Sequence, residues 1–168
     1  MMGRGKGISS IGEWTRRGFT RGSLSVEMAV LAPLLVILLF GTVEMGMILK
    51  DVMVLNSAAR EAARAASIGA TNADTVSRAG AAATTITTAN LAVQLDYRTL
   101  ASGVWSAWTP LTTVSGASQN SAPTGSQIRV ILNYPHPLIV GRLFTSLLAT
   151  NQTANTMSLR ATMIMMRE

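Results

Sequence analysis

The sequence contains no cysteine and a single histidine, His136. The absence of cysteine excludes a disulfide, a thiolate nucleophile and a cysteine-ligated metal site. His136 stands between two prolines in "YPHP", which predicts an exposed turn and a structural role, and no nucleophile motif accompanies it. Asp74 and Asp96 are isolated and lack metal-ligand spacing. We therefore expect no catalytic residue, no metal site and no cofactor.

Charged and aromatic residues are scarce. Charged residues make up 13% of the chain, which is about half the roughly 25% of an ordinary globular protein. Hydrophobic residues reach 48%, with a mean hydropathy of +0.34. This balance predicts a chain that associates with a membrane or assembles with other subunits.

The formal charge of +6 is concentrated at the N-terminus. Residues 1–21 hold five basic residues and one acid, +5 − 1 = +4, which leaves +6 − 4 = +2 for the rest. A nucleic-acid surface would need a basic stripe interleaved with aromatics on the folded part, and aromatics are only 5% of the chain. We therefore expect no nucleic-acid partner.

One long apolar run follows this basic segment. Residues 28–43 carry no charge, and the apolar character continues to Leu49. The 22 residues from 28 to 49 would cover roughly 33 Å as a helix, about one hydrocarbon core. The basic flank predicts a cytoplasmic N-terminus, with the bulk of the chain outside. We therefore predict a basic leader at 1–22 and a transmembrane helix at 23–49, kinked at Pro33.

The helix is expected to continue beyond the membrane. Residues 54–69 are rich in alanine, and Gly69 is a plausible C-cap, so we predict one helix from about Leu24 to Ile68. The alanines permit close helix packing or simply favour helix formation, and the sequence leaves both explanations open. A second helix is predicted within 71–90, which places a helical extension at 50–90.

Alternating patterns dominate the remaining residues. They predict a small sheet-containing domain at 91–168, with a tight turn at Ser102-Gly103. The expected strands are 91–100, 103–109, 127–135 and 156–168. A polar loop is expected at 112–126 and a short apolar helix at 137–149. The predicted fold is α+β and membrane-anchored: a long N-terminal helix packed on a small antiparallel sheet, with one or two short helices.

A glycine, Gly22, lies five residues before the acid Glu27, at the start of the apolar run. With Gly22 as position −1, Ser23 is +1 and Glu27 is +5, directly before the apolar run. This layout resembles a class III, type IV pilin-like signal, in which a prepilin peptidase cuts after the glycine and the helix is kept. The cut would free an α-amine on Ser23, one helical turn from Glu27. Pairing with that amine, or with the amine of an adjacent subunit, would offset the cost of a carboxylate near hydrocarbon.

A wider pattern extends from residue 22 to residue 66. It comprises G-x-x-x-V-E-x-A at 22–29, Pro33, G-x-x-E-x-G at Gly41, Glu44 and Gly46, and the tract "AAREAAR". This pattern strongly resembles the TadE-like family of the tight-adherence (Flp) pilus system. The resemblance implies a non-enzymatic minor pilin, or pseudopilin, that takes part in pilus biogenesis or adherence. Its implied partners are the prepilin peptidase, other pilin or pseudopilin subunits, the assembly machinery and the lipid bilayer.

The resemblance also fixes the expected location and site residues. We expect a single-pass protein of the bacterial inner membrane, with its C-terminal domain periplasmic or extracellular and possible association with the pilus. Processing is assigned to Gly22, Ser23 and Glu27. Helix packing or assembly is assigned to Glu27, Pro33, Gly41, Glu44 and Gly46. Glu44 could instead extend outward at the membrane face, and both roles stay open. The alternative function is an unprocessed, single-pass envelope protein with a small external binding domain.

Overall fold

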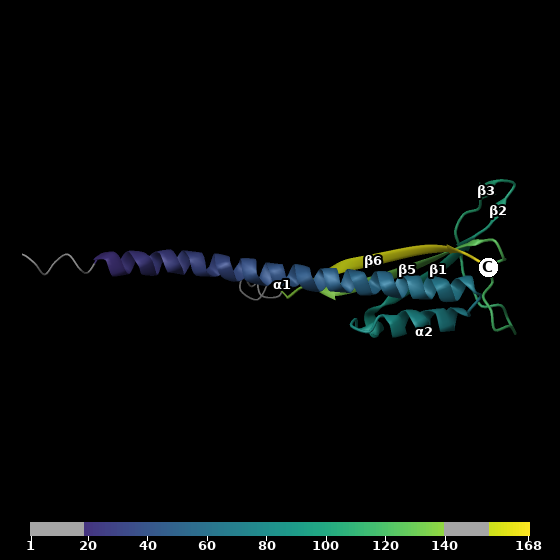
Figure 1. Ribbon diagram of the computed structural model, residues 1–168, viewed down its shortest axis with the longest axis horizontal. Coiled ribbons are helices and arrows are strands. Elements are labelled where there is room, and N and C mark those ends of the chain that lie inside the picture. Colours follow the sequence, from purple (N-terminus) through teal and green to yellow (C-terminus); the bar gives the residue numbers. More distant parts are fainter. Residues whose placement is uncertain (1–18, 140–154) are drawn as a thin grey trace, which may run out of the picture. The chain divides into compact units, whose positions relative to one another are not determined.

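A computed structural model describes residues 19–139 and 155–168 (Figure 1). The chain divides into two compact units, Met1–Gly41 and Thr42–Glu168. The predicted leader lies almost wholly outside the described residues, as does most of the helix predicted at 137–149. The elements are α1 (Phe19–Ser67), α2 (Asn72–Ala82), the 3-10 helix η1 (Thr88–Asn90), β1 (Ala92–Arg98), β2 (Leu100–Ala101), β3 (Val104–Trp105), β4 (Thr109–Pro110), β5 (Gln127–Pro137) and β6 (Thr156–Met166).

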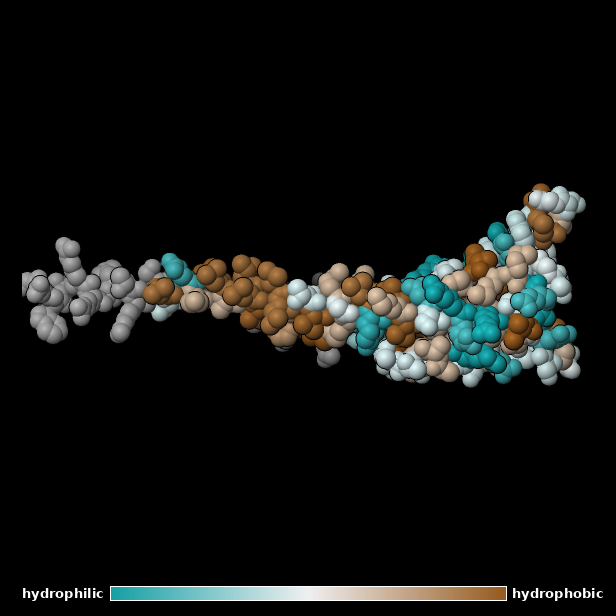
Figure 2. All heavy atoms as spheres, viewed as in Figure 1, coloured by the Kyte–Doolittle hydropathy of each residue, from teal (hydrophilic) through white to brown (hydrophobic). Residues whose placement is uncertain are grey.

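Helix α1 is continuous over 49 residues, which confirms the single long helix predicted from the sequence. Within the first unit its side chains from Leu24 to Phe40 are all exposed although nearly all are apolar. Among the described residues, this helix is the one that is long and apolar enough to cross a membrane, with a mean hydropathy of 2.4 in its most apolar window. Figure 2 shows this stretch of α1 as a mostly brown, hydrophobic surface. An exposed surface of this size suggests membrane anchoring.

The second unit contains a four-stranded antiparallel sheet in the order β4-β1-β5-β6. Strand β5 is central and pairs with β6 over its whole length, from Gln127 opposite Met166 to Pro137 opposite Thr156. The strands predicted at 91–100, 127–135 and 156–168 are thus confirmed. The predicted return strand at 103–109 is wrong in detail. Its first residues form β3, which pairs with β2 alone, and only Thr109 reaches the sheet.

Alanines bring the last third of α1 close to the sheet and to α2. Ala58, Ala59, Ala62, Ala63 and Ala66 are each at most 1% exposed. They belong to one apolar cluster with the inward-facing side chains of β1, β5 and β6 and with two alanines in and just after α2. The small side chains therefore serve close packing within this chain, because a methyl group lets neighbouring backbones approach.

Helix α2 is shorter than predicted. Thr71 caps its first turn by accepting from the Asp74 amide at 3.1 Å, but the helix ends at Ala82 rather than near residue 90. A β-branched run at 84–88 follows, and such side chains lose rotamer freedom in a helix. Ile86 lies in the apolar core instead, 6% exposed.

The C-terminal end of α1 is closed by a glycine. Gly69 has φ +96°, and its amide donates to the Ala66 carbonyl at 3.0 Å. The Ala70 amide donates to the Ala65 carbonyl at 3.0 Å, which completes a Schellman motif. The predicted C-cap at Gly69 is confirmed.

Two segments distant in sequence are fastened to the same helix end. The Asn120 side-chain amide donates to the carbonyls of Ala66 and Ala70, at 2.8 and 3.0 Å. The Arg167 guanidinium donates to the carbonyls of Ala122 and Ser67, at 3.2 and 3.4 Å. A cation at a helix C-terminus is favourable because unpaired carbonyls carry partial negative charge. The loop at 112–126 and the end of β6 are thereby held against α1.

Replacing Gly69 by alanine is expected to lower the free energy of unfolding by about 1–3 kcal/mol. A left-handed conformation is unfavourable for a residue with a Cβ, typically by about 1–2 kcal/mol. A Cβ at Gly69 would also lie 2.3 Å from Arg167 Nη1, so the guanidinium must move. Denaturant unfolding of the full chain in detergent, followed by circular dichroism, would measure the change.

Gly80→Ala is the matched control. Gly80 lies inside α2, and a Cβ there would meet only Thr88 Cγ2 at 3.8 Å, an ordinary contact. Alanine is favoured over glycine in a helix by about 1 kcal/mol, so this variant should be as stable as the parent or more so. Equal stability of the two variants would contradict the role assigned to Gly69.

Candidate functional site

A buried polar cluster joins α1 to the end of β5 in the second unit. Along β5 the buried side chains Val130, Leu132, Tyr134 and His136 alternate, as expected for a strand with one face on the core. This alternation directs His136 towards α1. Helix α1 presents two carboxylates there, Glu44 and Asp51, seven residues apart and therefore two turns apart on one helix face.

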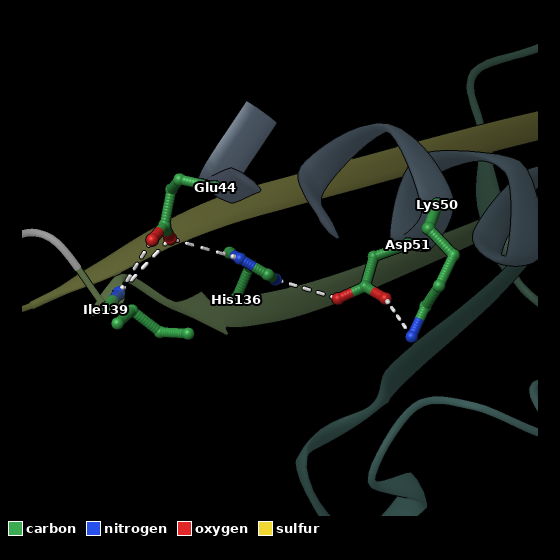
Figure 3. A network of polar contacts seen from close by, with 5 residues as sticks. All are labelled: Glu44, Lys50, Asp51, His136 and Ile139. Atoms are coloured by element: carbon green, nitrogen blue, oxygen red, sulfur yellow. Dashed lines mark hydrogen bonds and ion pairs between the residues drawn. The ribbon is translucent and has the colours of Figure 1, made fainter. Parts of the chain in front are cut away.

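The imidazole of His136 lies between the two carboxylates (Figure 3). Its Nδ1 is 2.7 Å from Asp51 Oδ2, and its Nε2 is 3.5 Å from Glu44 Oε1. All three side chains are at most 8% exposed. The Nε2 contact is an ion-pair distance rather than a hydrogen bond, whereas the Asp51 contact has hydrogen-bond length.

Each carboxylate has a second partner. The Glu44 carboxylate accepts from the Ile139 amide, at 2.9 and 3.2 Å to its two oxygens. Asp51 Oδ1 lies 3.7 Å from the Lys50 ammonium, which is 54% exposed. Buried carboxylates are costly unless they are paired and hydrogen-bonded. The cluster meets that condition with groups from α1, β5 and the residues just after β5.

A cleft of about 240 Å³ opens beside this cluster. Its lining includes Met47 and Lys50 from α1, Thr85, and Pro137 to Ile139 at the end of β5. Asp51 and His136 also line the cleft, but both nitrogens of the imidazole face carboxylates of the same chain. The geometry thus favours a fastening between helix and strand over acid–base chemistry. Within residues 19–139 and 155–168, no cluster of acids and histidine is arranged to hold a metal ion.

The prediction of an exposed turn at His136 is wrong. The residue is 4% exposed and lies within β5, opposite Met157 of β6. The flanking prolines are tolerated because β1 begins only at Ala92, opposite Asn133, so the last residues of β5 have no β1 partner on that side. The structural role predicted for His136 agrees with its position.

Sequence reasoning missed Asp51 as a partner and placed Glu44 either at the membrane face or in a subunit contact. The structure places Glu44 against Ile139 and His136 of the same chain, 6% exposed. One signal could have found the cluster. Two acids seven residues apart on a helix and a lone histidine in a strand pattern are complementary groups on surfaces that must pack together.

The remaining predicted site residues lie along α1. Gly22 and Ser23 fall within the helix, while Glu27 and Pro33 are exposed. Gly41 and Gly46 leave open space, since a Cβ at either would meet no atom within 4 Å. None of these six residues is a member of the polar cluster, and their roles in processing and assembly stay predictions.

The described residues thus form an α+β protein with one long apolar helix and a buried histidine–carboxylate cluster. Residues 22–64 match the family model described as TadE-like protein. This match agrees with the resemblance predicted for this part of the chain, and the family suggests a Tad pilus-associated protein. The comparisons with curated proteins and with solved structures found no match.

Replacing His136 by alanine should destabilise the second unit by about 1–3 kcal/mol or more, the usual cost of leaving a buried polar group without its hydrogen-bond partner. Asp51 and Glu44 would then be buried without the imidazole. In a double-mutant cycle, His136→Ala combined with Asp51→Ala should be less destabilising than the sum of the two single variants, with a coupling energy of about 1–3 kcal/mol. Denaturant unfolding of the full chain in detergent gives all four values.

Arg78→Ala provides the control for loss of an ion pair. Arg78 Nη1 lies 3.5 Å from Glu61 Oε1, and both side chains are substantially exposed, 54% and 41%. Exposed pairs contribute about 0–1 kcal/mol, so this variant should be close to the parent. Additive effects of the His136 and Asp51 substitutions would show that the two side chains do not act together.

Proposed function

We propose that the chain is a non-enzymatic minor pilin, or pseudopilin, of a Tad/Flp-type pilus. It is inserted in the inner membrane through α1 with its N-terminus in the cytoplasm, and a prepilin peptidase cuts between Gly22 and Ser23. After the cut the helix is retained and meets other pilin or pseudopilin subunits. The residues after the predicted membrane helix, 50–168, then lie on the periplasmic side.

The observation that carries this proposal is the position of the family match. The match begins at Gly22 and extends through the exposed apolar stretch of α1 to Arg64, in the alanine-rich part of the helix. It therefore covers both the proposed processing site and the segment that would remain in the membrane. The acid at Glu27 lies at the start of that stretch and is exposed in the single chain, so it is accessible to an amine.

The contacts between α1 and the end of β5 would hold the sheet in place on the helix of the proposed subunit. The Asp51–His136 contact and the Glu44 contact to Ile139 join the helix to the sheet near the start of the second unit. In a membrane-anchored subunit these contacts would couple the first turns of this helical segment to the sheet. A packed subunit would then present its sheet domain in a defined orientation relative to the helix segment 42–67.

Cleavage after Gly22 is tested by the N-terminal residue and intact mass of the protein recovered from membranes in which its native secretion genes are expressed. We expect a chain that begins at Ser23. Gly22→Ala should block the cut, because a peptidase of this type reads the residue before the bond, whereas Gly18→Ala in the leader should leave it intact. A parent chain that keeps its leader would contradict the proposal and favour an unprocessed envelope protein.

Glu27→Ala is expected to leave membrane insertion and cleavage unchanged but to reduce pilus assembly at least tenfold. Its removal takes away the proposed partner of the Ser23 α-amine while making the helix more apolar. Met28→Ala, at the neighbouring exposed position, keeps the carboxylate and should assemble normally. Surface pili can be counted by electron microscopy of cells in which each variant is present at the same level. Normal numbers of pili with Glu27→Ala would exclude the pairing.

A further inference from the structure

A short hairpin of the second unit extends away from the four-stranded sheet. Strands β2 and β3 pair only with each other, through Leu100 opposite Trp105 and Ala101 opposite Val104 (Figure 1). The turn between them, Ser102-Gly103, has φ of +51° and +81°, the geometry of a tight type I′ turn. This confirms the predicted turn, although the strands it joins are short.

The hairpin carries apolar side chains that nothing in the described chain covers well. Leu100 is 52% exposed and Val104 is 70% exposed. Because Leu100 pairs with Trp105 and Val104 pairs with Ala101, the two exposed side chains lie on opposite faces of the ribbon. In Figure 2 the hairpin projects from the second unit and carries apolar (brown) residues beside near-neutral (white) ones. Exposure on both faces fits an element that enters a groove rather than one that covers a flat surface.

Stacked arginine and tryptophan side chains hold the base of the hairpin. The Arg98 guanidinium lies 5.0 Å from the Trp105 ring centre and 4.5 Å from the Trp108 ring centre. The Arg129 guanidinium lies 4.2 Å from the Trp108 ring centre. Such cation–π contacts orient the rings and the guanidinium groups together. The hairpin is therefore ordered before it meets any partner, which lowers the entropic cost of binding.

The charges at this base do not balance. Arg129 is paired with Asp96 at 2.6 Å, whereas Arg98 donates to the neutral Gln127 side chain at 2.8 Å. Among the described residues that take part in these contacts, two guanidinium groups stand against one carboxylate, +2 − 1 = +1, and that carboxylate is bound to Arg129. A guanidinium binds a carboxylate through two parallel hydrogen bonds, so Arg98 is suited to a carboxylate supplied from outside the chain.

We propose that the hairpin at 99–106 is a docking element for another protein of the pilus system, one that presents an apolar groove with carboxylates at its rim. Leu100 and Val104 enter the groove, and Arg98 pairs with a rim carboxylate. Tryptophan and arginine are the residues most enriched at the energetic centres of protein interfaces. This inference rests on the proposed pilus function for the identity of the partner.

Two other occupants fit less well. A lipid bilayer would have to accept the polar backbone of the Ser102-Gly103 turn first, since the turn is the end of the hairpin. A second copy of this chain offers the cleft beside Met47 and Ile139, but the acid in its lining, Asp51, already contacts His136 and Lys50 of the same chain. The excess positive charge therefore favours a different, acidic protein.

The test uses the full chain in cells that express the native secretion genes. A photo-crosslinking amino acid, p-benzoylphenylalanine, replaces Val104, and in a control it replaces Val114, an apolar loop residue that is 39% exposed. We expect irradiation to give one discrete protein adduct from position 104 and at least tenfold less from position 114. Adding Arg98→Glu should reduce the adduct at least tenfold, and changing the facing carboxylate of the captured protein to arginine should restore it.

Thermal unfolding of the Arg98→Glu chain establishes that it is folded. If it is not, Arg98→Gln, which keeps a neutral hydrogen-bonding group, replaces it with the same expected reduction. An adduct of twice the chain mass, an adduct with lipid, or no excess over position 114 would each overturn the inference. The N-terminal residue of the chain is determined in the same samples. A chain that starts at Ser23 but gives no adduct overturns the docking role and leaves the pilin function standing. An adduct on an unprocessed chain supports docking and contradicts the pilin function.

Discussion

The close approach of helix α1 to the sheet depends on alanine at the positions where they meet. Ala58, Ala59, Ala62, Ala63 and Ala66 are almost fully buried in a cluster with residues of β1, β5, β6 and the α2 region. A larger side chain there would have to displace packed neighbours, and overpacking a core is destabilising. The positions of the loop at 112–126 and of the C-terminus follow from this contact, because each is hydrogen-bonded to the end of the same helix.

Polar contacts supplement the apolar contact at the two ends of the packed helix segment. At its first turns, Asp51 and Glu44 meet His136 and the Ile139 amide. At its last turn, the Asn120 and Arg167 side chains meet backbone carbonyls. Buried polar groups tolerate few alternative arrangements, since an unpaired one costs about 1–3 kcal/mol. The helix is thus fixed along its length as well as against the sheet, as an anchored subunit requires if its domain is to face a partner consistently.

The proposed pilus function divides the molecule between two kinds of surface. The exposed apolar side chains from Leu24 to Phe40 are suited to lipid or to other helices, and the TadE-like match lies over them. The hairpin at 99–106 is suited to a protein groove, and within the described part of the chain the Arg98 beside it is hydrogen-bonded to Gln127 rather than to a carboxylate. An assembly component needs both, because the membrane helix sets where the subunit lies and a second contact sets which neighbour it meets.

The sequence by itself determined the continuous helix, the Gly69 cap, the main strands and the TadE-like resemblance of residues 22–64, since each depends on local periodicity, glycine geometry or residue spacing. The sequence predicted too long an α2, because the chain leaves the helix after Ala82 and buries Ile86 in the core. It also predicted an exposed turn at His136, because the two flanking prolines were given more weight than the strand pattern. Only the tertiary structure decided that His136 lies between Glu44 and Asp51 and that Arg98 stacks on two tryptophans. The His136 contacts join residues far apart in the chain and are set by how the helix packs on the sheet. The Arg98 contacts depend on how the β2–β3 hairpin folds back. No local pattern encodes either arrangement.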